Sequence, residues 1–330
     1  KRLTILTQDL VTPYMREALF VKQNSQKWKQ YEHMLQANPD DIANQFIEIT
    51  NDLAYARTFY PSSKTAAYLN GLASKLHQSV YKNKKESTNR FITFWKTELP
   101  MIFFTYRKQI FYASAFFILS CLIGALSAKY DDTFVRLIMG DRYVNMTNEN
   151  IAKGDPFGVY KNQNQFLMFF QIGANNIYVA LYTFVLGIIF SFGSIVSLFR
   201  NGIMLGSFQY FFFSKGLGIK SVLVIWIHGT LEISAIILAG AAGLVLGNNL
   251  LFPKTFTRKV SVFRGAKDGL KMVIGLVPIF IVAAFFESFV TRYTEMPVFL
   301  SLLILVSSAA FIIWYVFIYP LKLSRSKPIN

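Results

Sequence analysis

Two ionisable residues, His228 and Glu232, lie four positions apart inside an otherwise apolar segment, residues 219–250. On a helix this spacing places both side chains on one face. A membrane-spanning helix needs about 20 apolar residues, and ionisable groups at that depth usually face protein or a water-filled cavity. His228 and Glu232 therefore have three possible roles: an interhelical hydrogen-bonded pair, a proton or ion site for transport or gating, or two ligands of a metal ion.

A metal site requires at least one further ligand and a supporting set of hydrogen bonds. The chain has three histidines, and the other two, His33 and His77, lie in its polar N-terminal region. The motifs His-Glu-x-x-His, Gly-x-Ser-x-Gly and the Walker loop are absent. We therefore predict no metal, no cofactor and no enzymatic activity, and the hydrogen-bonded pair is preferred to the transport site.

The helix face that carries the pair continues as a row of small residues. These residues are Ala235, Ala239, Gly243 and Gly247. Small residues let two helices approach closely in lipid. We expect this row to pack against another helix, so that the His228–Glu232 pair is buried against protein.

Two further groups of polar residues stand near predicted span boundaries. Arg200 and Asn201 precede the packing spacing Gly202-x-x-x-Gly206. They predict either a positive anchor with a tight turn or a broken helix whose freed backbone groups line a pocket under His228. Asn175 and Asn176 are expected to cap the second span.

The composition excludes an ordinary soluble domain. The chain is 53% hydrophobic, contains 33 Phe, and carries a formal net charge of +16. Its apolar residues form long runs, which is typical of an all-α polytopic membrane protein. The basic residues gather in particular loops, as topology signals do, so nucleic-acid binding is not expected. Cys121 is the single cysteine and cannot form an intrachain disulfide.

Six spans are predicted, the third being short or broken. Their ranges are 109–128, 177–198, 202–213, 219–250, 272–290 and 298–319. Loop 129–161 has five basic and five acidic residues and is placed outside, whereas 254–271 has six basic residues and one acidic residue and is placed in the cytoplasm. An amphipathic elbow, 162–176, is expected along the outer interface. Both termini, including the tail 321–330, are then cytoplasmic.

The polar region 1–90 is predicted to be a cytoplasmic helical domain. Apolar stripes on either side of Pro61 indicate a helical hairpin. Arg57 and Tyr60 are expected to tie the hairpin together around its turn, with Asp52 as a candidate partner for Arg57. Residues 91–108 predict an interfacial helix leading into the membrane bundle, 109–320.

The chain combines several short motifs, which are Asp52-Leu-Ala-Tyr-Ala-Arg-Thr-Phe-Tyr-Pro61, Tyr68-Leu-Asn70, Asn175-Asn176, Asn201-Gly202-x-x-x-Gly206 and His228-Gly-x-x-Glu232 through Ala-Gly-Ala-Ala-Gly243. Together these motifs resemble the stage II sporulation protein M (SpoIIM) family of integral membrane proteins. The resemblance covers residues 25–320, with one departure, Ile227, where members often carry Pro.

The resemblance implies partners as well as a fold. The founding member is an engulfment protein that works with peptidoglycan-degrading partners as an organiser, not as the hydrolase. In members from organisms that make no spores, the gene tends to lie near genes for RDD-family membrane proteins and MoxR-type AAA ATPases. The expected function is a non-enzymatic scaffold in the bacterial inner membrane, in contact with lipid and forming a homodimer.

The alternative function is a transporter or permease-like subunit that works with a separate ATPase. Six spans preceded by an interfacial helix also resemble export permeases. A polar cavity reaching His228 would favour transport, whereas a sealed bundle would favour the scaffold. An intramembrane enzyme is the least favoured class.

Overall fold

The computed structural model describes residues 15–33, 39–82, 90–160 and 164–326, and these contain helices but no strand. The chain divides into two compact units, Lys1–Arg90 and Phe91–Asn330, which are described separately. The expected boundary between loop and elbow at 161–162 and the end of the tail, 327–330, lie outside the described residues.

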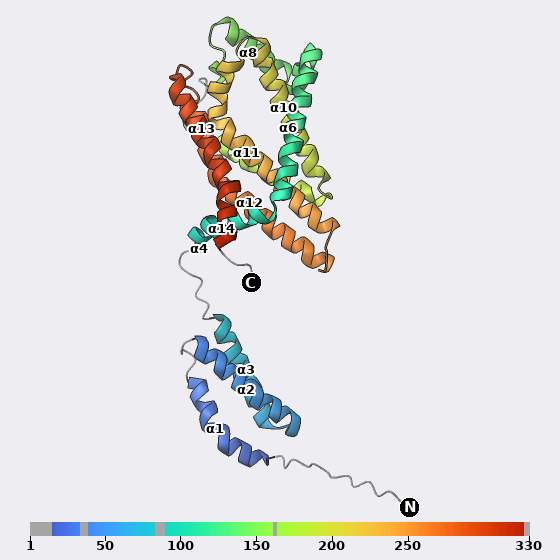
Figure 1. Ribbon diagram of the computed structural model, residues 1–330, viewed down its shortest axis with the longest axis vertical. Coiled ribbons are helices and arrows are strands. Elements are labelled where there is room, and N and C mark those ends of the chain that lie inside the picture. Colours follow the sequence, from blue (N-terminus) through green and yellow to red (C-terminus); the bar gives the residue numbers. More distant parts are fainter. Residues whose placement is uncertain (1–14, 34–38, 83–89, 161–163, 327–330) are drawn as a thin grey trace, which may run out of the picture. The chain divides into compact units, whose positions relative to one another are not determined.

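The N-terminal unit is built from three helices, α1 (Glu17–His33), α2 (Pro39–Phe59) and α3 (Lys64–Lys82) (Figure 1). The turn at Pro61 joins α2 to α3, which pack on one another as a hairpin. Their facing apolar stripes form one core, to which α1 adds Phe20 and Trp28. Ile42, Ile49 and Leu69 are completely buried there.

Polar side chains link the three helices of this unit. Arg57 donates to Asn70 Oδ1 at 2.7 Å and so connects α2 to α3. Asp52, the expected partner of Arg57, instead accepts from Trp28 Nε1 at 2.8 Å and pairs with Lys27. Tyr60, just before Pro61, donates its hydroxyl to the backbone oxygen of Met15. Asp52 therefore connects α2 to α1, because α1 supplies Lys27 and Trp28 as its partners in place of Arg57.

The membrane unit begins with short helices and continues into long ones. The short N-terminal elements are α4 (Arg90–Thr93), the π-helical turn η1 (Phe94–Glu98) and α5 (Leu99–Thr105). The long helices and the turns that extend them are α6 (Arg107–Tyr130), α9 (Gln165–Val185) with η3 (Leu186–Ile188), α10 (Phe192–Ser214), α11 (Gly218–Leu251), α12 (Arg258–Phe285) with η4 (Phe286–Val290), and α13 (Val298–Ile313) with η5 (Trp314–Ile318) and α14 (Tyr319–Ser326).

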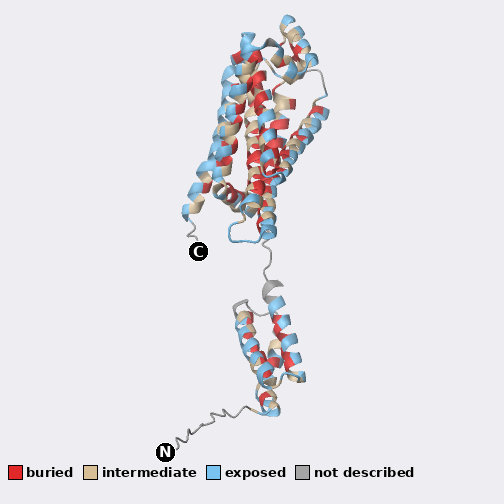
Figure 2. Cartoon of the chain, turned by 90° about the vertical axis from the view of Figure 1, so that its right-hand side faces the viewer, coloured by how far each residue is buried: buried red, intermediate tan, exposed pale blue. Residues whose placement is uncertain are grey.

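Five helices of the described chain are long and apolar enough to cross a membrane. They span Arg107–Tyr130, Gln165–Ile188, Gly218–Leu251, Arg258–Val290 and Val298–Ser326. Buried residues gather along the centre of this unit (Figure 2), while large apolar side chains such as Phe111, Leu122 and Leu303 stay exposed on its outside. Such a surface suits lipid and would be costly in water. The prediction of an all-helical membrane protein is confirmed.

The prediction of a short or broken third segment is wrong. Residues 202–213 belong to α10, a continuous helix of 23 residues. It is not one of the five candidate spans, because Arg200, Asn201 and Gln209 interrupt its apolar run. The count of six spans stays a prediction.

The second span also differs from the expected boundaries. Asn164 accepts hydrogen bonds from the backbone nitrogens of Phe166 and Leu167, which starts α9 twelve residues before the predicted position. Residues 165–176 are therefore part of the long helix and not a separate elbow. Their polar residues gave the segment an interfacial pattern, but Gln171 and Asn176 line a cavity inside the bundle.

The helix α11 lies at the centre of the unit and packs against α6, α9, α10, α12 and α13 (Figure 1). Its row of small residues, Ala235, Ala239, Gly243 and Gly247, is buried. A Cβ at Gly243 would stand 2.8 Å from Ser194 Cβ and 2.9 Å from the backbone oxygen of Thr183. The row therefore packs tightly against the end of α9 and the start of α10.

The second pair of glycines, Gly202 and Gly206, packs α10 against α6. A Cβ at Gly202 would lie 2.6 Å from Ser120 Cβ, and one at Gly206 would lie 2.9 Å from the backbone nitrogen of Ala125. Without side chains at these two positions, the two helix backbones can approach closely.

The segment that precedes α6 is anchored by polar contacts to later helices. Lys271 forms an ion pair with Glu98, and Tyr106 donates to Asp268 at 2.8 Å. Tyr315 donates to the backbone oxygen of Trp95 at 2.7 Å. Burial, followed by the hydrogen bond to Asp268, raises the pKa of Tyr106, so this phenol remains a donor at neutral pH.

Between α6 and α9 the described chain forms two amphipathic helices, α7 (Asp132–Met139) and α8 (Asp141–Ala152), and the turn η2 (Gly158–Tyr160). Val135, Val144 and Phe157 pack with Phe211, Phe212 and Val224 in a separate small core. This core fixes α7 and α8 against the ends of α10 and α11.

Candidate functional site

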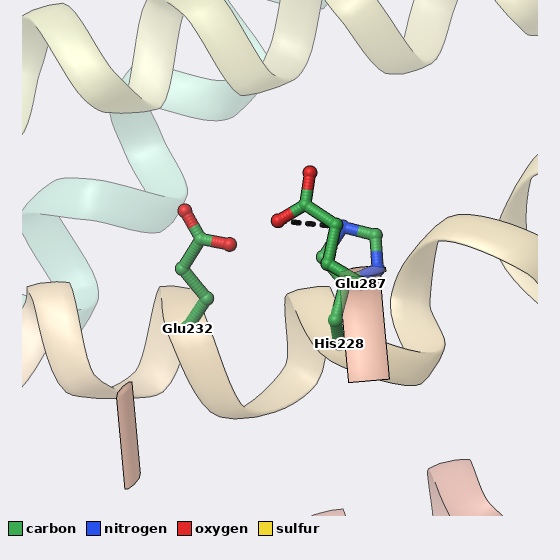
Figure 3. A group of neighbouring side chains, drawn as sticks. All are labelled: His228, Glu232 and Glu287. Carbon is green, nitrogen blue, oxygen red and sulfur yellow. Dashed lines mark ion pairs between the residues drawn. The ribbon is translucent and has the colours of Figure 1, made fainter. Parts of the chain in front are cut away.

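Three ionisable side chains meet in the interior of the membrane unit. His228 and Glu232 extend from one face of α11, and Glu287 comes from η4, at the end of α12 (Figure 3). One ligand atom from each, an imidazole nitrogen or a carboxylate oxygen, can be chosen so that all three lie within 4.8 Å of one another. His228 Nε2 is 3.9 Å from Glu287 Oε2. We refer to these three residues as the His–Glu–Glu cluster.

The cluster is largely closed to solvent. The His228 side chain is 6% exposed and that of Glu287 is 17% exposed. Burying an isolated charge costs several kcal/mol even after the protein relaxes, so such groups require partners. Two carboxylates at one buried place further require a positive charge or a proton between them.

A hydrogen bond fixes the orientation of the imidazole. His228 Nδ1 lies 2.9 Å from the hydroxyl oxygen of Thr291, which is itself buried. When Nδ1 carries the hydrogen, it donates to Thr291 and leaves the lone pair of Nε2 directed toward Glu287. The Thr291 backbone nitrogen donates to the oxygen of Phe286, five residues earlier, and closes a π-helical turn. Such turns are frequent at functional sites.

The cluster opens into a cavity of about 620 Å³. Its walls come from α7, α8, α9, α10, α11 and η4. The polar lining residues are Tyr143, Gln171, Asn175, Asn176, Trp226, His228, Glu232 and Glu287. No Lys or Arg is among the described residues that line it. Among the described lining residues, the cavity therefore combines two carboxylates with one imidazole and no Lys or Arg.

The wall opposite α11 carries an amide without a complete hydrogen bond. Asn176 on α9 is 5% exposed, and its Nδ2 has no hydrogen-bond partner among the described residues. The Asn176 side chain approaches Glu232, although the contact does not reach hydrogen-bond geometry. An unpaired buried amide is costly, by about 1–3 kcal/mol, which makes Asn176 a candidate ligand-facing group.

Tyr143 contributes a neutral polar group at the loop end of the cavity. It lies on α8 and is half-buried. Burial raises the pKa of Tyr143 to about 12, so its phenol is uncharged at neutral pH. The carboxylates of Glu232 and Glu287 are therefore the groups that give this cavity its preference for positive charge.

The other residues selected from the sequence lie in different places. Asn175 lines the cavity, but neither it nor Asn176 caps a helix, because both lie well inside α9. Arg200, a candidate for a buried polar residue of a pocket under His228, is instead exposed and does not line the cavity. Asn201 donates to the backbone oxygen of Ser197 at 2.8 Å within α10. An unbroken α10 has no freed backbone groups to offer to His228.

Glu287 and Thr291 are the residues that the sequence analysis missed. The expected partners of His228 and Glu232 were the pair itself or the third segment, whereas the structure supplies them from the end of α12. The available signal was the same one that singled out Glu232. Glu287 is a lone carboxylate inside an apolar predicted span, 272–290. The third ligand required for a metal site is therefore present.

Comparisons with known proteins identify the family of the membrane unit. Residues 113–292 match the family model described as Stage II sporulation protein M, which includes all three residues of the cluster. Residues 18–82, in the N-terminal unit, match a domain of unknown function (DUF8413). Neither the search of curated proteins nor the search of solved structures found a match.

Proposed function

Because the chain belongs to the stage II sporulation protein M family, we propose that it is a multi-pass protein of the bacterial cytoplasmic membrane whose bundle binds a small polar, positively charged ligand. The observation that supports this proposal is the cavity of about 620 Å³ that reaches His228, Glu232 and Glu287. A bundle serving only as a scaffold has no need of such a space. The permease-like alternative therefore becomes the preferred function.

The energetic argument favours a ligand over a purely structural role for the cluster. A structural polar group is stabilising when its partners are satisfied inside the protein. Here two carboxylates share the cavity with an imidazole and an unpaired amide, and no described Lys or Arg lines it. A positively charged ligand would compensate the carboxylates, and a water molecule bound with it could accept a hydrogen bond from Asn176 Nδ2.

The direction of access follows from the charge of the loops. The described helices α7 and α8 line the cavity and belong to the loop with balanced charge, 129–161. The segment 254–271 at the other end of α11 is strongly basic. By the positive-inside rule, α7 and α8 face the outside and the basic segment faces the cytoplasm. The ligand would then enter the cavity from the outer side.

A second function, that of an organiser, is favoured by the N-terminal unit. This unit has its own core and a family match separate from that of the membrane unit. We assign it the binding of partner proteins on the cytoplasmic side, a peptidoglycan-degrading system or an ATPase being the classes that the family resemblance suggests. The SpoIIM family is not known as an enzyme family, and we propose no catalytic step.

Cysteine accessibility tests the cavity directly. Gly229 lines the cavity beside His228, and a Cβ at this position would meet no atom within 4 Å. In a Cys121→Ser background, Gly229→Cys should react with a small polar thiol reagent applied to the outside of intact cells. Thr183→Cys, a buried position on α9 that does not line the cavity, is the matched control and should not react.

Protection of Gly229→Cys in a correctly folded protein would show that the cavity is closed and would remove the basis of the proposal. Labelling that occurs only in inverted vesicles would reverse the direction of access but leave ligand binding in place.

A further inference from the structure

We propose that the His–Glu–Glu cluster binds a divalent transition-metal ion through His228 Nε2 and one carboxylate oxygen each from Glu232 and Glu287. This inference rests on the proposed function, because it names the ligand class of the same cavity. The sequence alone predicted no metal, since only two of the three ligands were recognised.

The three ligand atoms are close enough for a metal ion after small side-chain rotations. They lie within 4.8 Å of one another. Around zinc, imidazole nitrogen and carboxylate oxygen stand at about 2.0–2.2 Å from the ion, so the ligands are roughly 3.3 Å apart in a tetrahedron. Glutamate has three side-chain torsions, and both carboxylates border an open cavity. The required closure can therefore occur without movement of the helices.

The imidazole already has the environment of a metal ligand. Histidines that bind metals usually donate the other ring N–H to an oxygen atom, which fixes the ring and its tautomer. Thr291 provides such an oxygen at 2.9 Å from His228 Nδ1. The nitrogen that remains, Nε2, is the one that faces Glu287 at 3.9 Å.

Charge balance gives an independent reason for a divalent cation. A neutral imidazole with two carboxylates carries two negative charges, and no described Lys or Arg lines the cavity to compensate them. A divalent ion makes the cluster neutral overall, which removes the cost of holding two like charges inside a membrane. A monovalent ion would need one further proton to do the same, and without any ion both carboxyl groups would have to be protonated.

The unpaired amide of Asn176 provides the second sign of a ligand. It is buried, lines the same cavity and approaches Glu232 from α9. Closure of Glu232 onto a metal, or a water molecule bound to the ion, would give its Nδ2 an acceptor. Three protein ligands leave at least one coordination position open toward the cavity, which is typical of sites that exchange or act on a ligand.

The ligand set selects the class of ion. Imidazole favours zinc and iron, whereas carboxylates are also accepted by manganese. Mg²⁺ and Ca²⁺ prefer sites made only of oxygen atoms. Across divalent ions in a fixed site, affinity rises from Mn²⁺ to Zn²⁺. Zn²⁺ is therefore expected to bind most tightly among Zn²⁺, Mn²⁺ and Mg²⁺.

Calorimetry on the purified full chain in detergent, after removal of metals with a chelator, tests the inference. We expect one Zn²⁺ per chain, with Mn²⁺ weaker and Mg²⁺ at least about tenfold weaker again than Mn²⁺. His228→Gln, Glu232→Gln and Glu287→Gln should each weaken Zn²⁺ binding by about 100-fold or more. Thr291→Val should weaken it by about 10-fold to 100-fold, because only the orienting hydrogen bond is lost.

Glu295→Gln is the matched control, since Glu295 is an exposed carboxylate outside the cavity. It should leave Zn²⁺ affinity unchanged. X-ray absorption of the zinc-loaded wild-type chain gives a readout that does not depend on the folding of any variant. It should show nitrogen and oxygen ligands at about 2.0–2.2 Å and no sulfur at about 2.3 Å.

Zn²⁺ binding that survives all three cluster substitutions, sulfur coordination through Cys121, or the absence of stoichiometric binding would each overturn the metal site. Labelling of Gly229→Cys together with no metal binding would reject this inference while the proposed function stands. No labelling together with no binding would reject both.

Discussion

Two substitutions of Glu232, by glutamine and by leucine, should affect the stability of the protein differently. An amide keeps the shape of the side chain and can still hydrogen-bond, whereas leucine removes the polar group that Asn176 approaches from α9. We predict that Glu232→Gln folds normally, and that Glu232→Leu lowers the free energy of unfolding by about 1–3 kcal/mol. Thermal unfolding of the two purified variants, in the absence of metal, measures the difference.

Equal stability of the leucine and glutamine variants would mean that Glu232 has no polar partner in the folded protein. The contact between Asn176 and Glu232 would then contribute nothing to the free energy of unfolding.

Two of the three residues of the cluster could be predicted from the sequence. His228 and Glu232 were recognised because they share a short helical spacing inside an apolar segment. Glu287 is 55 residues beyond Glu232, and its position beside His228 depends on how α12 packs against α11. A lone carboxylate in a predicted span signals a buried polar group, but local spacing cannot say which helix it will meet.

The helices are held together by glycines whose missing side chains admit a neighbouring backbone. We predict that Gly243→Ala destabilises the bundle, because its Cβ would stand 2.8 Å from Ser194 Cβ and 2.9 Å from the Thr183 oxygen. Overpacking of this kind costs about 1–3 kcal/mol. Gly229→Ala on the same helix is the matched control, because a Cβ there meets nothing within 4 Å.

Thermal unfolding of the two alanine variants shows whether close packing or helix propensity determines the effect of the substitution at Gly243. Alanine favours helix at both positions, so a rise in stability at Gly243 as large as that at Gly229 would show that the row of small residues makes no close contact.

The elements themselves were predictable where long apolar runs outweigh the few polar residues. The helices α11 and α13 begin within one residue of the positions expected from the sequence. The boundaries around α9 and α10 were not predictable, because Asn176 and Gln209 face polar groups inside the bundle. A polar residue that lines an internal cavity gives the same sequence pattern as one at a membrane interface.

For the whole molecule, the topology remains the central prediction. We expect the loop that holds α8 to be outside and the basic segment before α12 to be cytoplasmic. In a Cys121→Ser background, Glu149→Cys should react with an impermeant thiol reagent on intact cells, whereas Lys259→Cys should react only after lysis. Both positions are exposed. The reverse labelling pattern would invert the proposed orientation.

The division into two units makes a prediction about folding. The N-terminal unit has a core of its own, in which Leu69 and Leu76 are completely buried. We predict that residues 15–82 form a soluble helical domain when produced alone, with a cooperative transition in circular dichroism. Leu69→Ala should lower its free energy of unfolding by about 2–5 kcal/mol.

A non-cooperative melt of this fragment would mean that its helices depend on the membrane unit for stability. The exposed substitution Lys75→Ala is the control, since surface changes usually alter stability by less than about 0.5 kcal/mol.

The π-helical turn η4 means that chain length, as well as residue identity, specifies the His–Glu–Glu cluster. The bond from Thr291 N to Phe286 O encloses one residue more than an α-helical turn would. Deleting a single residue there would restore the α-helical phase and rotate the following chain by about 100°. Thr291 would then turn away from His228 although no ligand had been mutated. A relative that retains all three ligands but lacks this extra residue would have lost the hydrogen bond that orients its imidazole.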